Sequence, residues 1–346
     1  MKSTGKFWGD ARRWLPGLLI SGIAIYAILR LVNFQDLGNA FSSIRLIYLV
    51  PTTFLVIVWL LLRALALKFI LAGKAGIMQT FRAINIGYLL NNILPLRAGE
   101  FGKAAVLGKS SGLGASFVFS SIVIERAFDL FYAASFLLIV LPLVLEMSWI
   151  RPVAFIVLAV VISGLLFLYF MAKNYQIVHA WIGKIGLKWG WVHKYVIPQI
   201  SAFLRGFSIL TDFRRFFLCL ITIGASWGMA VVLYYLMLFS ITPHPQLWWG
   251  VFVNSILAMG IAIPSAPAAL GVFEASVVAA LKVLGISYSQ ALAYAVIIHF
   301  VQFALTGVIG MVSLAREKQS IDAIFALSRK KDTGEEKKVT ASESTE

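Results

Sequence analysis

Long apolar runs, separated by short polar stretches, follow one another along almost the whole chain. Many of them approach the ~20 residues that a helix needs to cross a bilayer. They predict spans at about residues 14–29, 46–67, 116–145, 153–172, 216–241, 247–263, 270–286 and 288–314. Because a spanning helix satisfies its own backbone hydrogen bonds, the pattern predicts an all-α fold, a polytopic membrane helix bundle with about eight crossings.

Composition supports a membrane protein. Of the 346 residues, 60% are hydrophobic and 13% are charged, whereas soluble domains have roughly 45–50% apolar and about 25% charged residues. No stretch before residue 315 has the composition of a separate soluble domain. We therefore expect one transmembrane domain over residues 1–315, followed at 316–346 by a polar tail that is disordered and cytoplasmic.

The formal charge of +15 belongs to the membrane region. Before residue 316 there are 23 Lys or Arg and eight Asp or Glu, and the tail holds seven of each. Basic residues concentrate in 63–109 and 173–215 and are few in 33–45, 146–151 and 242–246. The positive-inside rule therefore predicts a multi-pass protein of the cytoplasmic (inner) membrane with both termini cytoplasmic. The basic loops indicate anionic lipid headgroups as partners, not nucleic acid.

Two further segments, the first apolar run and residues 173–215, need separate interpretations. The first apolar run follows basic residues and looks like a signal peptide, but it has no clear small-x-small cleavage site, so we expect a retained first span. Segment 173–215 mixes tryptophans and aliphatic residues with lysines. This mixture favours a helix lying in the headgroup region, with an ordinary cytoplasmic loop as the alternative.

A helix break is predicted in "NNILPLRAGEFGKAAVLG", residues 91–108. Pro95 lacks a backbone N–H and disfavours helix at the residue before it, and Gly99 follows closely. A helix can restart beyond the break with Glu100 near its N-terminus, where a carboxylate is favoured. The break also carries Arg97, so a charged turn is expected between two apolar helices.

A second break is predicted in "ILAMGIAIPSAPAALGVFEASVVAALKVLG". Pro264 and Pro267 interrupt an apolar run, Gly271 follows, and a helix restarts that contains Glu274. Interrupted hydrophobic segments in corresponding halves of a chain are typical of transporter binding sites. Irregular backbone at membrane depth is tolerated only inside protein or beside a wet cavity. Both segments are therefore predicted to be broken or re-entrant, with cytoplasmic loops as the alternative.

A charged helix lies between the two breaks. "IERAFD" places Glu125, Arg126 and Asp129 in the third span, at spacings that share about one face. Each ion costs about 2.5–3.5 kcal/mol at the bilayer centre, so the three are predicted to face the bundle. A structural salt bridge is one interpretation. Four of the eight acids before the tail lie here or in the breaks, which favours a common polar cavity containing Arg97, Glu100, Lys103, Glu125, Arg126, Asp129 and Glu274.

Patterns for catalysis and metal binding are absent from the sequence. "GKAAVLGKSS" encloses five residues between its glycines where a phosphate loop needs four, and no strand precedes it. The four histidines show no metal spacing, and the lone Cys219 cannot complete a cysteine-rich zinc site. We expect no enzyme activity, no cofactor and no metal site. His299 and Gln302 could face the polar cavity, but we interpret them as a satisfied core pair.

Three motifs together resemble one known family. "NNILPLRAGE", "ERAFD" and "PSAPAALGVFE", in this order and spacing, are similar to the lysylphosphatidylglycerol synthase transmembrane family, a flippase-like domain that also occurs as a stand-alone protein. The resemblance covers about residues 15–315. It implies a lipid translocase with two re-entrant helices. The family positions that it transfers to this chain are Asn92, Pro95, Arg97, Gly99, Glu100, Glu125, Arg126, Asp129, Pro264, Pro267, Gly271 and Glu274.

Four positions depart from the family pattern. Leu96 stands where the family often has Gly, and Lys103 where it often has Arg. Lys103 keeps the charge but not the bidentate fork of a guanidinium. Ala268 and Ala269 stand where glycines are common. The lost glycines limit how closely the backbone of the second break can approach a ligand.

The leading functional hypothesis is a flippase or carrier for an anionic phospholipid or a polyprenyl-phosphate-linked sugar. Arg97, Arg126 and Lys103 can bind phosphate, because charge-assisted hydrogen bonds are strong in a dry site. The acids would balance these cations, and one of them could carry a coupling proton. The alternatives are a non-transporting accessory subunit of a lipid or glycan synthase and, third, a membrane transferase. The resemblance also implies a homodimer. The aminoacyl-transfer domain of the synthases is not expected in this chain, so it should move a lipid and not make one.

Overall fold

The structure, a computed structural model, describes residues 4–94, 97–144, 150–174 and 211–317, together with a few positions between 177 and 207. All regular elements in these ranges are helices, which confirms the predicted all-α fold. The predictions for Pro95 and Leu96, for most of segment 173–215 and for the tail beyond residue 317 lie outside the described residues.

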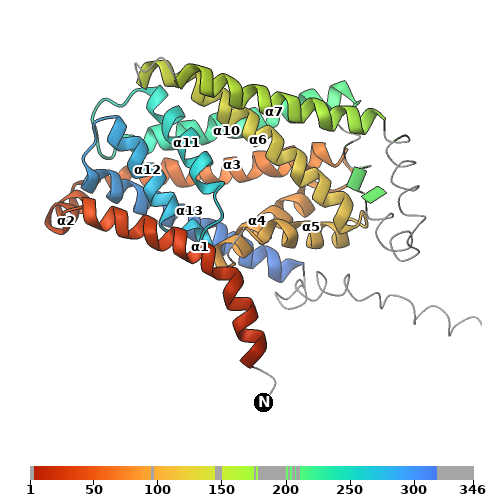
Figure 1. Ribbon diagram of the computed structural model, residues 1–346, viewed down its shortest axis with the longest axis horizontal. Helices are drawn as coiled ribbons and strands as arrows, with labels where there is room; N and C mark the ends of the chain where they lie inside the picture. Colours follow the sequence, from red (N-terminus) through yellow and green to blue (C-terminus); the bar gives the residue numbers. More distant parts are fainter. Residues whose placement is uncertain are drawn as a thin grey trace, which may run out of the picture.

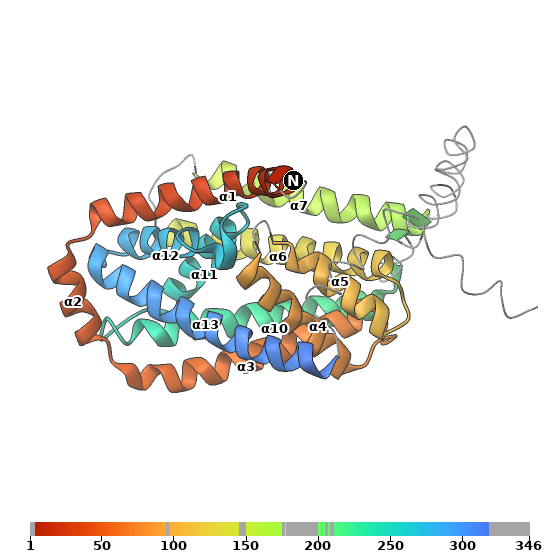
Figure 2. The ribbon, with the colours of Figure 1, turned by 90° about the horizontal axis from the view of Figure 1, so that it is seen from below.

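Long helices run along the long axis of the molecule and form its frame (Figure 1, Figure 2). α3 and α10 pack closely against each other, and α6 packs on α7, α10 and α11. Large apolar side chains on the flanks are exposed, among them Phe155, Leu166 and Phe300 at 61–68%. Such flanks suit contact with lipid. The frame consists of α1 (Thr4–Leu31), α3 (Leu49–Ile70), α6 (Ala115–Val144), α7 (Ile150–Lys173), α10 (Phe213–Leu238) and α13 (Tyr288–Arg316).

Two helical hairpins occupy opposite halves of this frame (Figure 1, Figure 2). One consists of α4 (Ile77–Ile93) and α5 (Gly99–Ser110), and the other of α11 (Leu247–Ile261), the 3₁₀ turn η4 (Pro267–Ala269) and α12 (Val272–Val283). Their arms have 12 to 17 residues, or about 18–26 Å at 1.5 Å per residue, which is shorter than the ~30 Å hydrocarbon core. The chain reverses direction within each hairpin, since its two arms pack side by side, and arms of this length suit a re-entrant segment.

The number of crossings differs from the prediction. Among the described residues, four helices are long and apolar enough to cross a membrane, or five if α1 and α2 (Phe34–Ser43), which are bent by 93° at their junction, are counted as one span. The eight predicted crossings are not confirmed. The apolar runs 247–263 and 270–286 were counted as two spans, but they form the arms of the α11–α12 hairpin, because the proline-rich break lets the second arm return beside the first.

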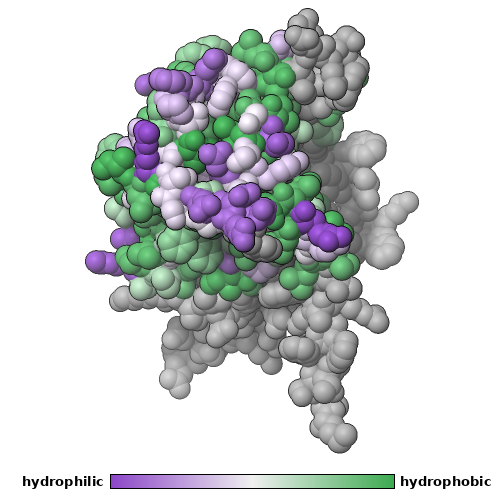
Figure 3. Space-filling model, turned by 90° about the vertical axis from the view of Figure 1, so that its left-hand side faces the viewer, coloured by the Kyte–Doolittle hydropathy of each residue, from purple (hydrophilic) through white to green (hydrophobic). Residues whose placement is uncertain are grey.

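Polar side chains gather at the centre of the end of the bundle that carries α2, with apolar ones around them (Figure 3). There the backbone N–H of Arg45, which precedes the short 3₁₀ turn η1 (Leu46–Tyr48), donates to the Ser240 carbonyl at the end of α10. Gln35, Asp36 and His244 are exposed in this part of the chain. A polar end above apolar flanks is the arrangement expected where the bundle leaves the bilayer.

Two glycines allow α4 and α5 to approach closely. A Cβ on Gly99 would lie 2.0 Å from the Gly87 carbonyl oxygen and 2.6 Å from Asn91 Oδ1. Asn91 Oδ1 in turn accepts a hydrogen bond of 2.8 Å from the backbone N–H of Gly99, the first residue of α5. The last turn of α4 therefore caps the start of α5, and the first hairpin is closed by backbone contact.

We predict that Gly99→Ala opens this contact and lowers the free energy of unfolding by about 1–3 kcal/mol, the usual cost of overpacking. Gly22→Ala is the matched control, because a Cβ on Gly22 meets nothing within 4 Å and alanine favours helix by about 0.5–1 kcal/mol. Unfolding in mixed micelles measures both variants. Equal stability of the two would contradict the close packing of α4 and α5.

Candidate functional site

The first break brings Arg97 into a strained turn. α4 ends at Ile93 and α5 begins at Gly99, as the sequence predicted. Arg97 has φ 56°, in the left-handed region, which costs a residue with a side chain about 1–2 kcal/mol. Such strain often accompanies function. Asn92 binds α13, since its Nδ2 donates to Thr306 Oγ1 at 3.0 Å.

A buried arginine on α3 joins the two carboxylates of α6. Arg63 is 3% exposed, and its guanidinium pairs with Asp129 at 2.6 and 2.9 Å and, through Nη2, with Glu125 Oε1. Trp227 of α10 donates from Nε1 to Asp129 Oδ1 at 3.0 Å. Asp129 is residue 15 of the 30 in α6, so these contacts lie far from both helix ends.

A second set of ion pairs connects α5 to α6. Lys103 Nζ lies 2.9 Å from Glu100 Oε2 and 3.0 Å from Glu125 Oε2. Arg126 bridges the same helices, with Nη2 at 3.1 Å from Glu100 and Nη1 at 3.2 Å from Asp129. We call these six side chains the charged network: Arg63, Glu100, Lys103, Glu125, Arg126 and Asp129.

The charged network is neutral by itself and carries one extra cation beside it. Three cations face three carboxylates. Arg97 lies just before α5, where its carbonyl oxygen accepts from the Glu100 N–H at 3.2 Å, yet among the described residues its side chain forms no ion pair. The Arg126 side chain is 34% exposed, whereas Arg63 and Lys103 are almost fully buried. The accessible positive charge of the site therefore lies on Arg97 and Arg126.

The second break forms a separate polar cluster. Ala268 and Ala269 are left-handed, with φ 57° and 55°, and Gly271 has φ 82°. α12 begins at Val272 and contains Glu274, as predicted, and Glu274 Oε2 accepts from the Gly271 N–H at 2.7 Å, so this acid also caps the helix. Glu274 Oε1 lies 2.6 Å from His299 Nδ1 on α13. The two alanines therefore occupy backbone that glycine would adopt more easily.

α1 covers the proline-rich turn of this cluster. Ser21 Oγ accepts a hydrogen bond of 3.0 Å from the Ala266 N–H, between Pro264 and Pro267. A Cβ on Gly17 would lie 2.8 Å from the Ser265 carbonyl oxygen. α4 also packs against η4, so the first hairpin contacts the break of the second.

The structure shows two clusters where the sequence predicted one cavity. Glu274 shares no hydrogen bond or ion pair with the charged network in the part of the chain that the structure describes. The reason is the fold, because α12 packs on α1, α11 and α13, whereas the charged network lies on α3, α5 and α6. His299 and Gln302 are both satisfied, but by Glu274 and by the Tyr234 hydroxyl, not by each other.

Sequence reasoning missed Arg63 as part of the site. It was assigned to a basic connection that starts at residue 63, but it lies inside α3 and is buried. An arginine within an apolar run must find a carboxylate inside the bundle, and this signal could have identified it. Trp227 gave no signal of its own in the sequence. In the described residues no group of three or more His, Cys, Asp or Glu side chains is arranged to hold a metal ion.

Comparison with known proteins agrees with the motifs. Residues 14–310 match the family model described as the lysylphosphatidylglycerol synthase TM region. A UPF0104 membrane protein of Methanothermobacter thermautotrophicus is 25% identical over 243 residues, covering 64% of this chain and 69% of the relative. A UPF0104 membrane protein of Methanocaldococcus jannaschii is 25% identical over 215 residues, covering 62% and 88%. No solved structure matches this chain.

We predict that Arg63→Met lowers the free energy of unfolding by about 3–5 kcal/mol, because it leaves Glu125 and Asp129 buried with too few cations. Adding Glu125→Gln should restore part of the loss, since the charged network is then neutral again. Arg82→Met is the control, because its ion pair with Glu317 is partly exposed and such pairs contribute about 0–1 kcal/mol. Equal losses for Arg63 and Arg82 would show that the charged network does not stabilise the bundle.

Proposed function

Since this chain belongs to the lysylphosphatidylglycerol synthase transmembrane family, we propose that it is a lipid translocase of the cytoplasmic membrane. Its substrate is an anionic lipid, either a phospholipid or a polyprenyl-phosphate-linked sugar. The protein is a membrane protein of the UPF0104 type, a class consistent with a lipid-related role. Transport of a particular lipid is our inference from the site.

The observation that carries the proposal is the position of Arg97. It lies in the turn of a hairpin too short to cross, on left-handed backbone, beside a charged network that is already neutral. A cation in such surroundings is stabilised most by an anion that does not belong to the charged network. Charge-assisted hydrogen bonds between a guanidinium and a phosphate are strong, so a phosphate group suits this position. Arg126 is the second accessible donor.

The carboxylates have a supporting role in this proposal. Glu100 and Asp129 each contact Arg126, so they hold its guanidinium in place before a ligand binds. Lys103 is enclosed by Glu100 and Glu125. It therefore contributes to the positive electrostatic potential of the site more than to direct contact with the phosphate. Preorganised charges of this kind favour binding because little further ordering is needed.

The contact between the two hairpins suggests a route for the headgroup. α4 packs on η4, so the helix that leads into the Arg97 turn touches the turn of the second break. A headgroup bound at Arg97 would be passed along these irregular segments while its acyl chains stay in the bilayer. Glu274 and His299 lie beside the second turn, where a carboxylate and an imidazole can exchange a proton.

A second candidate is a non-transporting accessory subunit that binds a lipid or a partner synthase. The observation in its favour is that each of the three carboxylates of the charged network already has a cation within 3.2 Å. A network satisfied in this way can serve as a static scaffold. The two candidates differ in whether the purified protein moves lipid by itself.

We predict that proteoliposomes containing the wild-type protein move a fluorescent anionic lipid between leaflets, measured by dithionite quenching. Arg97→Ala should reduce the rate by about 10–100-fold, because one charge-assisted bond is worth about 1.5–3 kcal/mol. Arg97→Lys should retain most of the transport rate. Glu274→Ala should abolish transport, because it removes the cap of α12. Insertion into the membrane should be unchanged in all three variants.

Arg82→Ala is the matched control for the loss of a guanidinium, since Arg82 pairs with Glu317 away from both breaks. It should transport at the wild-type rate. Full transport by both Arg97→Ala and Glu274→Ala would refute the proposal. Absence of transport by the wild-type protein, with lipid still bound, would favour the accessory role.

A further inference from the structure

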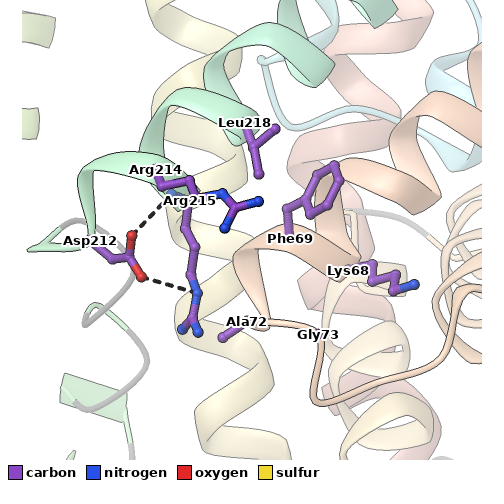
Figure 4. A pocket seen from close by; sticks show the side chains of 8 residues that line it. All are labelled: Lys68, Phe69, Ala72, Gly73, Asp212, Arg214, Arg215 and Leu218. Atoms are coloured by element: carbon purple, nitrogen blue, oxygen red, sulfur yellow. Dashed lines mark hydrogen bonds and ion pairs between the residues drawn. The ribbon is translucent and has the colours of Figure 1, made fainter.

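A basic pocket of about 290 Å³ lies between the C-terminal end of α3 and the N-terminal end of α10 (Figure 4). It shares no residue with the charged network or with the cluster around Glu274, so the proposed translocation does not explain it. The side chains that define its character are Lys68, Phe69, Asp212, Arg214, Arg215 and Leu218.

The basic pocket has two cations in excess. Asp212 Oδ2 lies 3.1 Å from Arg215 Nε, and Asp212 Oδ1 accepts from the Arg215 backbone N–H at 3.2 Å. Arg215 is therefore neutralised, and the N-terminus of α10 is capped by the chain itself. Lys68 and Arg214 make no ion pair within the described part of the chain, as Figure 4 illustrates for the lining residues.

The position of the basic pocket favours a lipid over a soluble anion. Lys68 lies in the last turn of a helix that is long and apolar enough to span the membrane, and α10 begins at Phe213. Phe213 and Phe217 are 81% and 49% exposed, and their rings stack at 6.1 Å. Exposed aromatic rings beside unpaired cations are typical of a surface where acyl chains meet headgroups.

We propose that this pocket binds the phosphate-bearing headgroup of an anionic phospholipid at the membrane surface, separately from the site at Arg97. Its volume is at the low end of the roughly 300–1,000 Å³ of ligand pockets, which suits a headgroup but not a whole lipid. Arg214 contacts the phosphate, Lys68 adds positive charge on the other side of Phe69 (Figure 4), and the acyl chains lie against Phe213 and Phe217. Each unpaired cation raises the preference for an anionic lipid about fivefold.

Native mass spectrometry of the purified full chain tests this assignment. The protein is equilibrated with equal amounts of phosphatidylglycerol and phosphatidylcholine of the same acyl chains. The wild type should retain phosphatidylglycerol preferentially, and the double variant Lys68→Gln/Arg214→Gln should lose about 25-fold of that preference. Lys74→Gln/Lys282→Gln removes the same charge from two exposed lysines outside the pocket and should behave as the wild type.

A second variant gives an effect of opposite sign. Asp212→Asn releases Arg215 from its ion pair and still caps α10, because Asn is as good an N-cap as Asp. It should raise the preference for phosphatidylglycerol about fivefold, a gain that a merely structural role of Asp212 would not produce. An unchanged preference in both the double variant and Asp212→Asn would overturn the proposal.

Inorganic phosphate distinguishes a lipid from a free anion. Millimolar phosphate should leave the phosphatidylglycerol adducts of the wild type in place, because the acyl chains add contacts that phosphate lacks. Displacement by phosphate to the level of Lys68→Gln/Arg214→Gln would assign the pocket to a soluble phosphate and overturn the lipid assignment.

Discussion

Charges inside a bilayer must be neutralised by other charges of the protein, and this requirement organises the molecule. Glu125 and Asp129 lie inside α6, so α3 must supply Arg63 and α5 must supply Lys103. The charged network thus fixes where three helices meet, and Trp227 adds α10 to the same point. Removing any one member leaves the buried network with one uncompensated charge, which is far more costly than never having had the pair.

The two helix breaks have a related cause. A hairpin that turns back inside the membrane leaves backbone groups without helical partners, so side chains must satisfy them. Asn91 does this at the first break and Glu274 at the second. Both turns also hold residues other than glycine in left-handed conformations, Arg97 in one and Ala268 and Ala269 in the other. Strain of this kind persists only where surrounding contacts impose it, which makes the contact between the hairpins a suitable place for function.

Much of this arrangement could be predicted from the sequence. Proline and glycine act locally, so the positions of both breaks and the helix starts near Glu100 and Glu274 were predicted correctly. The face shared by Glu125, Arg126 and Asp129 follows from helical periodicity. The pairing of Arg63 with α6 and of His299 with Glu274 depends on which helices pack together, and no local pattern encodes that. The predicted eight crossings are not confirmed by the described residues, and a short apolar run looks the same in sequence whether it crosses or turns back.

The proposed transport depends on Arg97 binding the anionic headgroup of a lipid. Mass spectrometry of lipids that remain with the purified protein tests it most directly, with the wild type compared with Arg97→Gln. One anionic lipid class should be enriched over the bulk membrane in the wild type and lost in the variant, while Arg82→Gln should retain it. The same enrichment in wild type and Arg97→Gln, or lipids that match the bulk membrane in both, would contradict the claim.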